Sequence, residues 1–384
     1  MAIKQMVLTV TVALACSACQ TSESQYQAIE VTGFSDVIKH WNDQNHRDPQ
    51  PRYALHQIRL IADNIIRYQR ANGGWPENIN PLRIMSEQEI ARQAALYSAT
   101  DTSFDNRNVY PQIRYLAEAY QQTRDETYQQ AVIRGLRFIL SAQLANGGFT
   151  HSPPSTEGYY GHITIMDDVM AGVLGLLQEI KLGSQRFDFL PADLVQQLSE
   201  AHRRGDALIL DLQVKTDGEL TIWAGQYDAN SLLPAKGRAF ELASLVSRES
   251  VDVVRYLMSD PAPSARKRQA INRAMAWFKN NALTGIDMVQ VEAEPVRYKY
   301  HTSAWDRVMV ATENSPPIWA RFYDLSTHKP LLANRQGQRV ESLAQISRER
   351  RTGYDWYGRW PAPLLADEYK AWQHKHAADG INTQ

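Results

Sequence analysis

The chain has 384 residues, 43% of them hydrophobic, which is enough to bury a large core as one domain or two smaller ones. Its 41 basic and 42 acidic residues nearly balance, so bulk charge argues against a nucleic-acid-binding surface and leaves only a local basic cleft open. The only two cysteines, Cys16 and Cys19, lie near the N-terminus, so the rest of the chain has no disulfide framework.

The N-terminus has the features of an export signal. Lys4 precedes an apolar run, Met6–Ala15, that is too short to span a bilayer. Ser-Ala before Cys19 resembles a bacterial lipobox, and Ala-Leu-Ala before Cys16 offers a second cleavage point. We expect a lipoprotein-type signal peptide over 1–19, a flexible leader over 20–45 and the main domain over 46–384. The protein would be exported, as a periplasmic, cell-surface or outer-membrane lipoprotein or a secreted protein, and would meet a membrane only through this N-terminal anchor.

Helical periodicity dominates the remainder of the chain. Apolar residues at three- and four-residue spacing predict helices over 55–69, 109–123, 127–142, 167–182, 192–212, 251–258 and 264–281. Short stretches that favour β-structure occur at 220–223, 289–291 and 308–311, followed by a strand at 316–324 and a short basic helix at 342–351. No βαβ alternation, phosphate-binding glycine loop or zinc-spaced Cys/His set is present.

The first and third helices end in the same motif. Asn72-Gly-Gly-Trp75 recurs as Asn146-Gly-Gly-Phe149, 74 residues later, which indicates a repeat of helix hairpins. We expect Trp75 and Phe149 to pack against their helices as structural residues, in preference to serving as substrate platforms. The fold class predicted is mainly α, an α/α toroid (an incomplete α/α barrel of helix hairpins) with short β-strands in the C-terminal part. Loops at one end of such a ring build a cleft.

The loop at 233–246 carries two cations. Pro234 and Gly237 interrupt any helix, so Lys236 and Arg238 lie on an irregular segment ahead of a helix for which Ser247 is the expected N-cap. Cations so placed suit an anionic ligand, and the alternative is a solvated turn.

Two acidic positions stand at equivalent places of the repeat. Asp105 precedes the helix that carries Arg114, and Asp167-Asp168 precedes the next such helix. Each alone is explained by an ordinary N-cap. Because equivalent loops of a toroid converge, the pair also suits a hard, oxygen-preferring cation, Ca²⁺ above all. His162 has no second histidine at metal spacing, so we expect it to be a structural hydrogen-bonding residue.

A series of motifs spans the chain from about Tyr53 to Pro361. They are Asp105-Asn106, Tyr110-X-Gln112-Ile113-Arg114, Asn146-Gly147-Gly148, Tyr160-X-His162-Ile163-Thr164 with Asp167, Trp223-X-X-Gln226-X-Asp228, Pro234-Ala-Lys-X-Arg238-Ala-Phe-Glu241, Glu249-Ser250, Asp306-Arg307-Val308, Trp319-Ala-Arg321-Phe-Tyr323, Arg335, and Glu349-Arg-Arg-X-Gly353-Tyr-X-Trp356-Tyr357-Gly358. In this order they resemble the family 10 pectate lyases.

The resemblance implies anti-β-elimination of polygalacturonate or oligogalacturonides, by a monomer with a Ca²⁺-dependent cleft. Asp105 and Asp167 resemble the family's Ca²⁺-associated carboxylates, Arg238 its base, and Arg321 and Arg335 its clamps on substrate carboxylates. Lys236 is expected to add a further substrate contact. Since a guanidinium is normally protonated, Arg238 as a base requires neighbouring cations and Ca²⁺ to lower its pKa.

The sequence departs from the family beside both aspartates. Arg107 stands where the family has glycine, and Met166 and Asp168 stand where it has asparagines. These changes keep three alternatives open: a lyase for another polyuronate, a non-catalytic oligogalacturonide-binding lipoprotein, and a purely structural helical lipoprotein.

Overall fold

The computed structural model describes residues 26–45 and 48–378. The expected signal peptide over 1–19 lies outside this part of the chain. Among the described residues, no helix combines the length and apolar character needed to cross a membrane.

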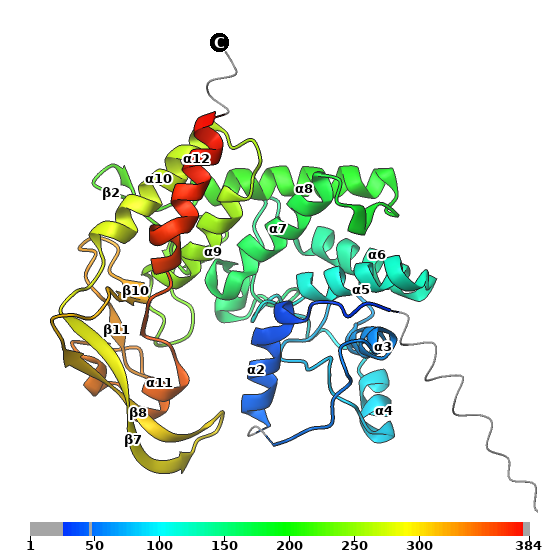
Figure 1. The fold of residues 1–384 in the computed structure, drawn as a ribbon, viewed down its shortest axis with the longest axis horizontal. Coiled ribbons are helices and arrows are strands. Elements are labelled where there is room, and N and C mark those ends of the chain that lie inside the picture. Colours follow the sequence, from blue (N-terminus) through cyan, green and yellow to red (C-terminus); the bar gives the residue numbers. More distant parts are fainter. Residues whose placement is uncertain (1–25, 46–47, 379–384) are drawn as a thin grey trace, which may run out of the picture.

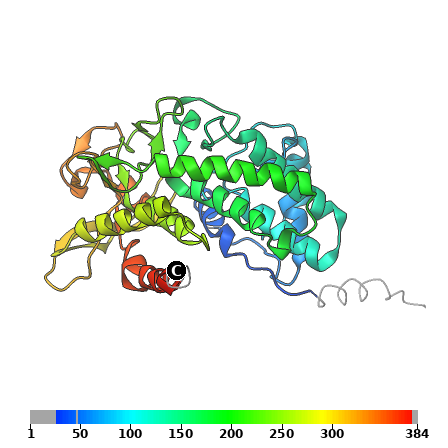
Figure 2. The same cartoon turned by 90° about the horizontal axis from the view of Figure 1, so that it is seen from above.

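Paired helices build the body of the molecule. The helices are α2 (Ser35–Gln44), α3 (Ile58–Tyr68), α4 (Glu87–Ala95), α5 (Tyr110–Thr123), α6 (Glu126–Ala142), α7 (Val169–Lys181), α8 (Ala192–Asp211), α9 (Ser247–Met258), α10 (Ala265–Asn280), α11 (Arg348–Gly353) and α12 (Tyr369–Ala378). Helix α5 packs on α6, α7 on α8 and α9 on α10. The hairpins follow one another around the molecule (Figures 1 and 2). The predicted α/α toroid is therefore confirmed, and all seven expected helices are present.

Three helices were not expected, and one of them is α12 near the end of the described chain. Helix α4 begins with a capping box, in which Ser86 accepts from the Glu89 N–H and the Glu89 side chain accepts from the Ser86 N–H. Helix α2 falls in the part of the chain that we assigned to a flexible leader, and it follows the 3₁₀ turn Thr32–Phe34. Because Phe34 and Val37 are buried, residues 32–45 belong to the folded domain and that assignment is wrong for them.

The two Asn-Gly-Gly loops end their helices in the same way. The Asn72 and Asn146 side chains each accept from the N–H two residues on, at 3.0 Å. Gly73 and Gly147 have φ of +92° and +96°, and a Cβ on Gly73 would lie 2.2 Å from the Arg134 carbonyl oxygen. Glycine is therefore required at this position by both conformation and space.

A buried aromatic closes each hairpin. Trp75 and Phe149 are fully buried, which confirms the expected structural role. Trp223 and Trp319 repeat the arrangement. The three indole N–H groups donate to main-chain carbonyls at the ends of preceding helices: Trp75 to Ile65 at 2.8 Å, Trp223 to Ile209 at 2.6 Å and Trp319 to Phe278 at 2.8 Å. The loops that follow these aromatics are thereby anchored to the helix ends.

Short strand pairs tie these loops together. Strand β4 (Gln226–Tyr227) lies between β1 (Ile163–Thr164) and β5 (Pro234–Ala235) in a sheet of three. The two-stranded pairs are β6 (Leu245–Val246) with β10 (Phe322–Tyr323), β9 (Trp319–Ala320) with β13 (Tyr357–Gly358), β2 (Lys215–Thr216) with β3 (Glu219–Leu220), and β11 (Leu332–Ala333) with β12 (Arg339–Val340). All are antiparallel.

One hairpin is much longer than expected. Strands β7 (Ile286–Arg297) and β8 (Thr302–Ala311) pair from Ile286 with Ala311 to Arg297 with Thr302, with an irregularity between Glu292 and Val296. The sequence indicated only its two apolar stretches, so the expectation of uniformly short strands is wrong here. Most of β7 lies exposed or half-buried. A strand without a buried face shows little alternation of apolar and polar residues, so its length is hard to predict from the sequence.

Candidate active site

Equivalent loops of the repeat place four residues at one end of the ring. Two positions after the aromatics Trp75, Phe149, Trp223 and Trp319 stand Glu77, His151, Gly225 and Arg321. The carbonyls of Trp75, Phe149 and Trp223 accept from Ser103, Thr164 and Val246, at 2.9–3.0 Å. These contacts lay the segment that carries Asp105 beside the first loop and the segment that carries Asp167 beside the second.

Neither aspartate serves as a helix cap. The N-cap of α5 is Val109 and that of α7 is Asp168, and neither makes a side-chain capping bond. Asp105 is instead only 1% exposed. Asp167 has φ of +51°, and the Gly225 carbonyl accepts from Ile165 and Met166 just before it. The local backbone thus serves to hold Asp167 in a turn, which removes the capping explanation for the pair.

Two arginines lie against these carboxylates. Arg238 Nη2 is 3.3 Å from Asp105 Oδ2, and its Nη1 is 4.0 Å from Asp167 Oδ2. Arg321 Nη2 lies 3.4 Å from Asp167 Oδ1. The structure therefore brings four of the six expected site residues together, from four separate parts of the chain.

Two glutamates hold the arginines in place. Glu241 Oε1 lies 3.0 Å from Arg238 Nη1, and its Oε2 accepts from the Arg238 main-chain N–H at 2.9 Å. Glu249 Oε1 accepts from Arg321 Nε at 2.9 Å and also contacts Nη2. Both glutamates stand in the motifs that carry the resemblance, and sequence reasoning assigned them no role. The spacing of three residues between Arg238 and Glu241 was the available signal.

The charge around Arg238 differs from the expectation. Burial alone would lower the pKa of the Arg238 guanidinium, but Glu241, Asp105 and Asp167 outweigh burial and raise that pKa well above its usual value. The expectation that neighbouring cations lower the pKa of Arg238 is therefore wrong for the protein groups in contact with it, because these groups are carboxylates. Burial, together with repulsion from Asp105, raises the pKa of Asp167 to about 7. The pKa of Asp105 is lowered, because the charges of His151 and Arg238 outweigh its burial.

Arg335 and Lys236 lie outside this cluster. The Arg335 guanidinium stands 5.8 Å from the centre of the Phe240 ring and 3.5 Å from Glu349. Phe240 packs edge-on against Tyr354, whose ring lies 4.5 Å from the Arg321 guanidinium, so Arg335 is linked to the site through two aromatic side chains. Lys236 is exposed and forms no ion pair with any described residue.

Comparison with known proteins now bears on this arrangement. Residues 69–365, most of the chain, match the family model described as pectic acid lyase. The chain belongs to the pectic acid lyase family. The family 10 polysaccharide lyase from Cellvibrio cellulosa is similar in structure, with a TM-score of 0.69 at 26% identity over 89% of this chain and 98% of that one. A mutant of that enzyme in complex with trigalacturonic acid gives the same TM-score and identity, over 90% and 99% of the two chains. No match was found among curated proteins. The protein is thus a polysaccharide lyase with the family's fold.

The departures of this pectic acid lyase can now be located. Arg107 Nη2 lies 2.8 Å from Asp252 Oδ2 on α9, so its charge is paired away from Asp105. Met166 is buried, and a Cβ on Gly225 would lie 2.9 Å from its sulfur. The contacts between the two arginines and the two aspartates are therefore present despite these two changes.

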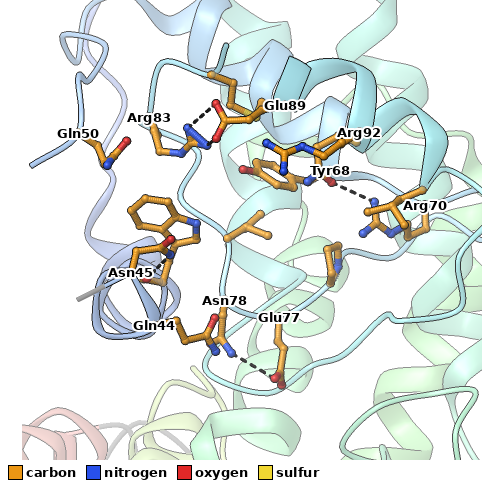
Figure 3. A pocket seen from close by; sticks show the side chains of 16 residues that line it. Gln44, Asn45, Gln50, Tyr68, Arg70, Glu77, Asn78, Arg83, Glu89 and Arg92 are labelled. Atoms are coloured by element: carbon orange, nitrogen blue, oxygen red, sulfur yellow. Dashed lines mark hydrogen bonds and ion pairs between the residues drawn. The ribbon is translucent and has the colours of Figure 1, made fainter. Parts of the chain in front are cut away.

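A further carboxylate adjoins the lyase cluster. One donor atom each from Glu77, Asp105 and His151 lies within 4.8 Å of the others. Glu77 also lines a pocket of about 470 Å³, where Asn78 donates to it at 3.1 Å (Figure 3). Burial of the carboxyl and repulsion from Asp105 raise the pKa of Glu77 to about 7, although the residue as a whole is exposed. Arg70 and Arg83 in this pocket are paired with Asp101 and Glu89.

Proposed function

We propose that the protein is a pectate lyase that cleaves polygalacturonate or oligogalacturonides by Ca²⁺-dependent anti-β-elimination. The observation that supports this most strongly is the buried cluster in which Arg238 and Arg321 contact Asp105 and Asp167. A galacturonan carries one carboxylate on each sugar, and arginine forks match planar carboxylates. The related lyase found in complex with trigalacturonic acid supports the same substrate class.

The proposed reaction uses the cluster as follows. A base removes the proton on C5, the bond from C4 to the glycosidic oxygen breaks, and a double bond forms between C4 and C5. The departing oxygen takes up a proton. Arg321 neutralises the carboxylate next to C5, where negative charge grows as the proton leaves, and Arg335 and Lys236 bind carboxylates of neighbouring sugars.

Arg238 is the proposed base, and its surroundings set a condition on that role. Three carboxylates raise the pKa of its guanidinium, so it can give up a proton only where added positive charge offsets them. In the absence of such charge Arg238 would act as a fixed cation beside the substrate. Replacement by lysine separates the two roles, because an ammonium keeps the charge while titrating at lower pH.

Asp105 and Asp167 fit a Ca²⁺ ion by their chemistry. Both offer only oxygen, and Asp105 Oδ1 is buried without a hydrogen-bond partner among the described residues. Their mutual repulsion, which raises the pKa of Asp167, would be relieved by a cation between them. When bound, Ca²⁺ supplies positive charge to the substrate carboxylate and to the surroundings of Arg238.

Export and a lipid anchor complete the proposal. They rest on the N-terminal sequence pattern alone, and a monomer active on pectic fragments near the cell surface is consistent with it. A lyase for another polyuronate would share the cluster and differ in product release from a panel of purified uronans. A non-catalytic binding lipoprotein would bind oligogalacturonides without turnover.

The test is an ultraviolet time course of unsaturated uronide formation from polygalacturonate at mildly alkaline pH. We expect absorbance to rise with Ca²⁺ and to stay flat with a chelator. The Arg238→Ala variant should bind oligogalacturonide and release no product. A flat wild-type trace with intact binding would favour the non-catalytic reading, and near-normal turnover by Arg238→Ala would remove that residue from the role of base.

A further inference from the structure

Glu77, Asp105 and His151 come from three loops of the repeat and meet beside the lyase cluster. Two of the three, Asp105 and His151, are 1% and 3% exposed. Glu77 is exposed and stands at the solvent side of the set. This set differs in kind from Asp105 and Asp167, because it contains an imidazole nitrogen.

Two serine hydroxyls lie beside the imidazole of His151 and its main-chain carbonyl. Ser103 Oγ donates its one proton to the His151 carbonyl at 3.0 Å, and Ser152 Oγ donates its own to Ser103 Oγ at 2.9 Å. Ser152 Oγ lies 2.6 Å from His151 Nδ1, close enough to accept a hydrogen bond from it. With Nδ1 as the donor, Nε2 of the neutral ring presents its lone pair on the side of Asp105 and can bind a metal ion. A metal-binding histidine is usually oriented by such a donation from its other nitrogen.

The side chains of His151 and Asp105 are in direct contact. His151 Nε2 and Asp105 Oδ2 are 3.1 Å apart. Even so, neither His151 Nε2 nor Asp105 Oδ1 has an aligned hydrogen-bond partner among the described residues. Two ligands of one tetrahedral Zn²⁺, at bonds of about 2.0–2.2 Å, stand about 3.4 Å apart. The 3.1 Å between Nε2 and Oδ2 is close to this spacing. Asp105 Oδ2 also contacts Arg238, so Oδ1, which is buried without a partner among the described residues, is the oxygen free to bind an ion.

Glu77 is placed to provide the third ligand. Its Oε1 accepts from Asn78 Nδ2 at 3.1 Å, and Asn78 Oδ1 in turn accepts from Asn106 Nδ2 at 2.8 Å. This chain of amides restrains the carboxylate and leaves its second oxygen available. The pocket next to Glu77 gives an ion a route of entry and room for an exchangeable ligand.

We propose that Glu77, Asp105 and His151 form a second metal site, which binds a divalent transition-metal ion such as Zn²⁺ in preference to Ca²⁺. Imidazole suits Zn²⁺ and Co²⁺, whereas Ca²⁺ takes six to eight oxygens. Three protein ligands leave a position open, as in catalytic zinc sites. The inference goes beyond the proposed pectate lyase activity and does not depend on it. The competing account is an ion pair between protonated His151 and Asp105, with no bound metal.

The test uses the full chain, stripped with chelator and studied without substrate. Titration with Co²⁺ should give visible d–d absorption that saturates at one ion per chain, and Zn²⁺ should displace it. His151→Gln and Glu77→Gln should each weaken metal binding. The loss should exceed roughly 10–100-fold, which is the cost of removing a residue that only hydrogen-bonds to a metal ligand. The matched controls His162→Gln and Glu157→Gln change the same residue types nearby, outside the cluster, and should bind as the wild type does.

Absence of saturable Co²⁺ or Zn²⁺ binding would overturn the proposal, as would equal loss in the control variants. Circular dichroism of each variant establishes that it is folded. Because no turnover is measured, failure here leaves the Ca²⁺-dependent lyase reaction to its own assay.

Discussion

The buried pair of Arg321 and Glu249 offers a quantitative test of how the site is held. The two side chains are 4% and 2% exposed, and Arg321 Nε donates to Glu249 Oε1 at 2.9 Å. Glu249→Gln keeps the shape but removes the charge opposite a buried guanidinium. Loss of one partner of a buried pair costs about 3–5 kcal/mol. Because Asp167 still lies 3.4 Å from Arg321, we expect the low end, about 3 kcal/mol.

Urea unfolding measures this loss as a change in the free energy of unfolding at constant slope. The matched control is Glu200→Gln, which removes an equally well aligned but exposed partner of Arg203 and should cause no measurable change. The double variant Glu249→Leu, Arg321→Met removes both buried charges and should be more stable than Glu249→Gln. If Glu249→Gln unfolds at the same urea concentration as Glu200→Gln, the pair does not hold Arg321 in the way described.

Two further predictions concern the substrate and pH. Arg335→Ala should raise KM for polygalacturonate about 10-fold with little change in kcat, because the exposed guanidinium binds a sugar remote from the reacting one; steady-state kinetics with an unchanged KM would exclude it as a clamp. Burial lowers the pKa of His202 to about 4 from its usual 6.5, so its neutral form contributes stability that is fully present above pH 6.5 and is lost as pH falls toward 4, by about 3 kcal/mol. In urea unfolding at several pH values, His202→Gln should lose less free energy of unfolding between pH 6.5 and 4 than the wild type does. An equal loss in the variant would show that other groups cause it.

The repeat made much of the fold accessible from sequence. The helices α5 and α6 follow their apolar periodicity, and the Asn-Gly-Gly loops end their helices because glycine alone accepts that backbone and spacing. The long hairpin of β7 and β8 was foreseen only in part, since pairing between two largely exposed strands depends on hydrogen bonds that leave little apolar pattern.

The candidate site, like the fold, could be predicted from the sequence only in part. Residue types and positions in the repeat selected Asp105 and Asp167, and the resemblance to the family 10 pectate lyases added Arg238 and Arg321. The fold brings the four side chains together. The sequence could not show that Glu241 and Glu249 surround the arginines, because a glutamate in a motif has the same letters whether it faces solvent or a buried guanidinium. The contact of His151 with Asp105 depends on two loops 46 residues apart in sequence and had no local signal.

The chemistry itself is tested most directly by mass spectrometry of the products from trigalacturonate incubated with the full chain and Ca²⁺. Elimination gives an unsaturated product that is lighter by one water than the corresponding hydrolysis product, together with a saturated one. We expect equal amounts of the two from the wild type and neither from Arg238→Ala. Saturated products alone would show hydrolysis and contradict the proposed reaction, and intact trigalacturonate with bound protein would show a binding protein in place of a lyase.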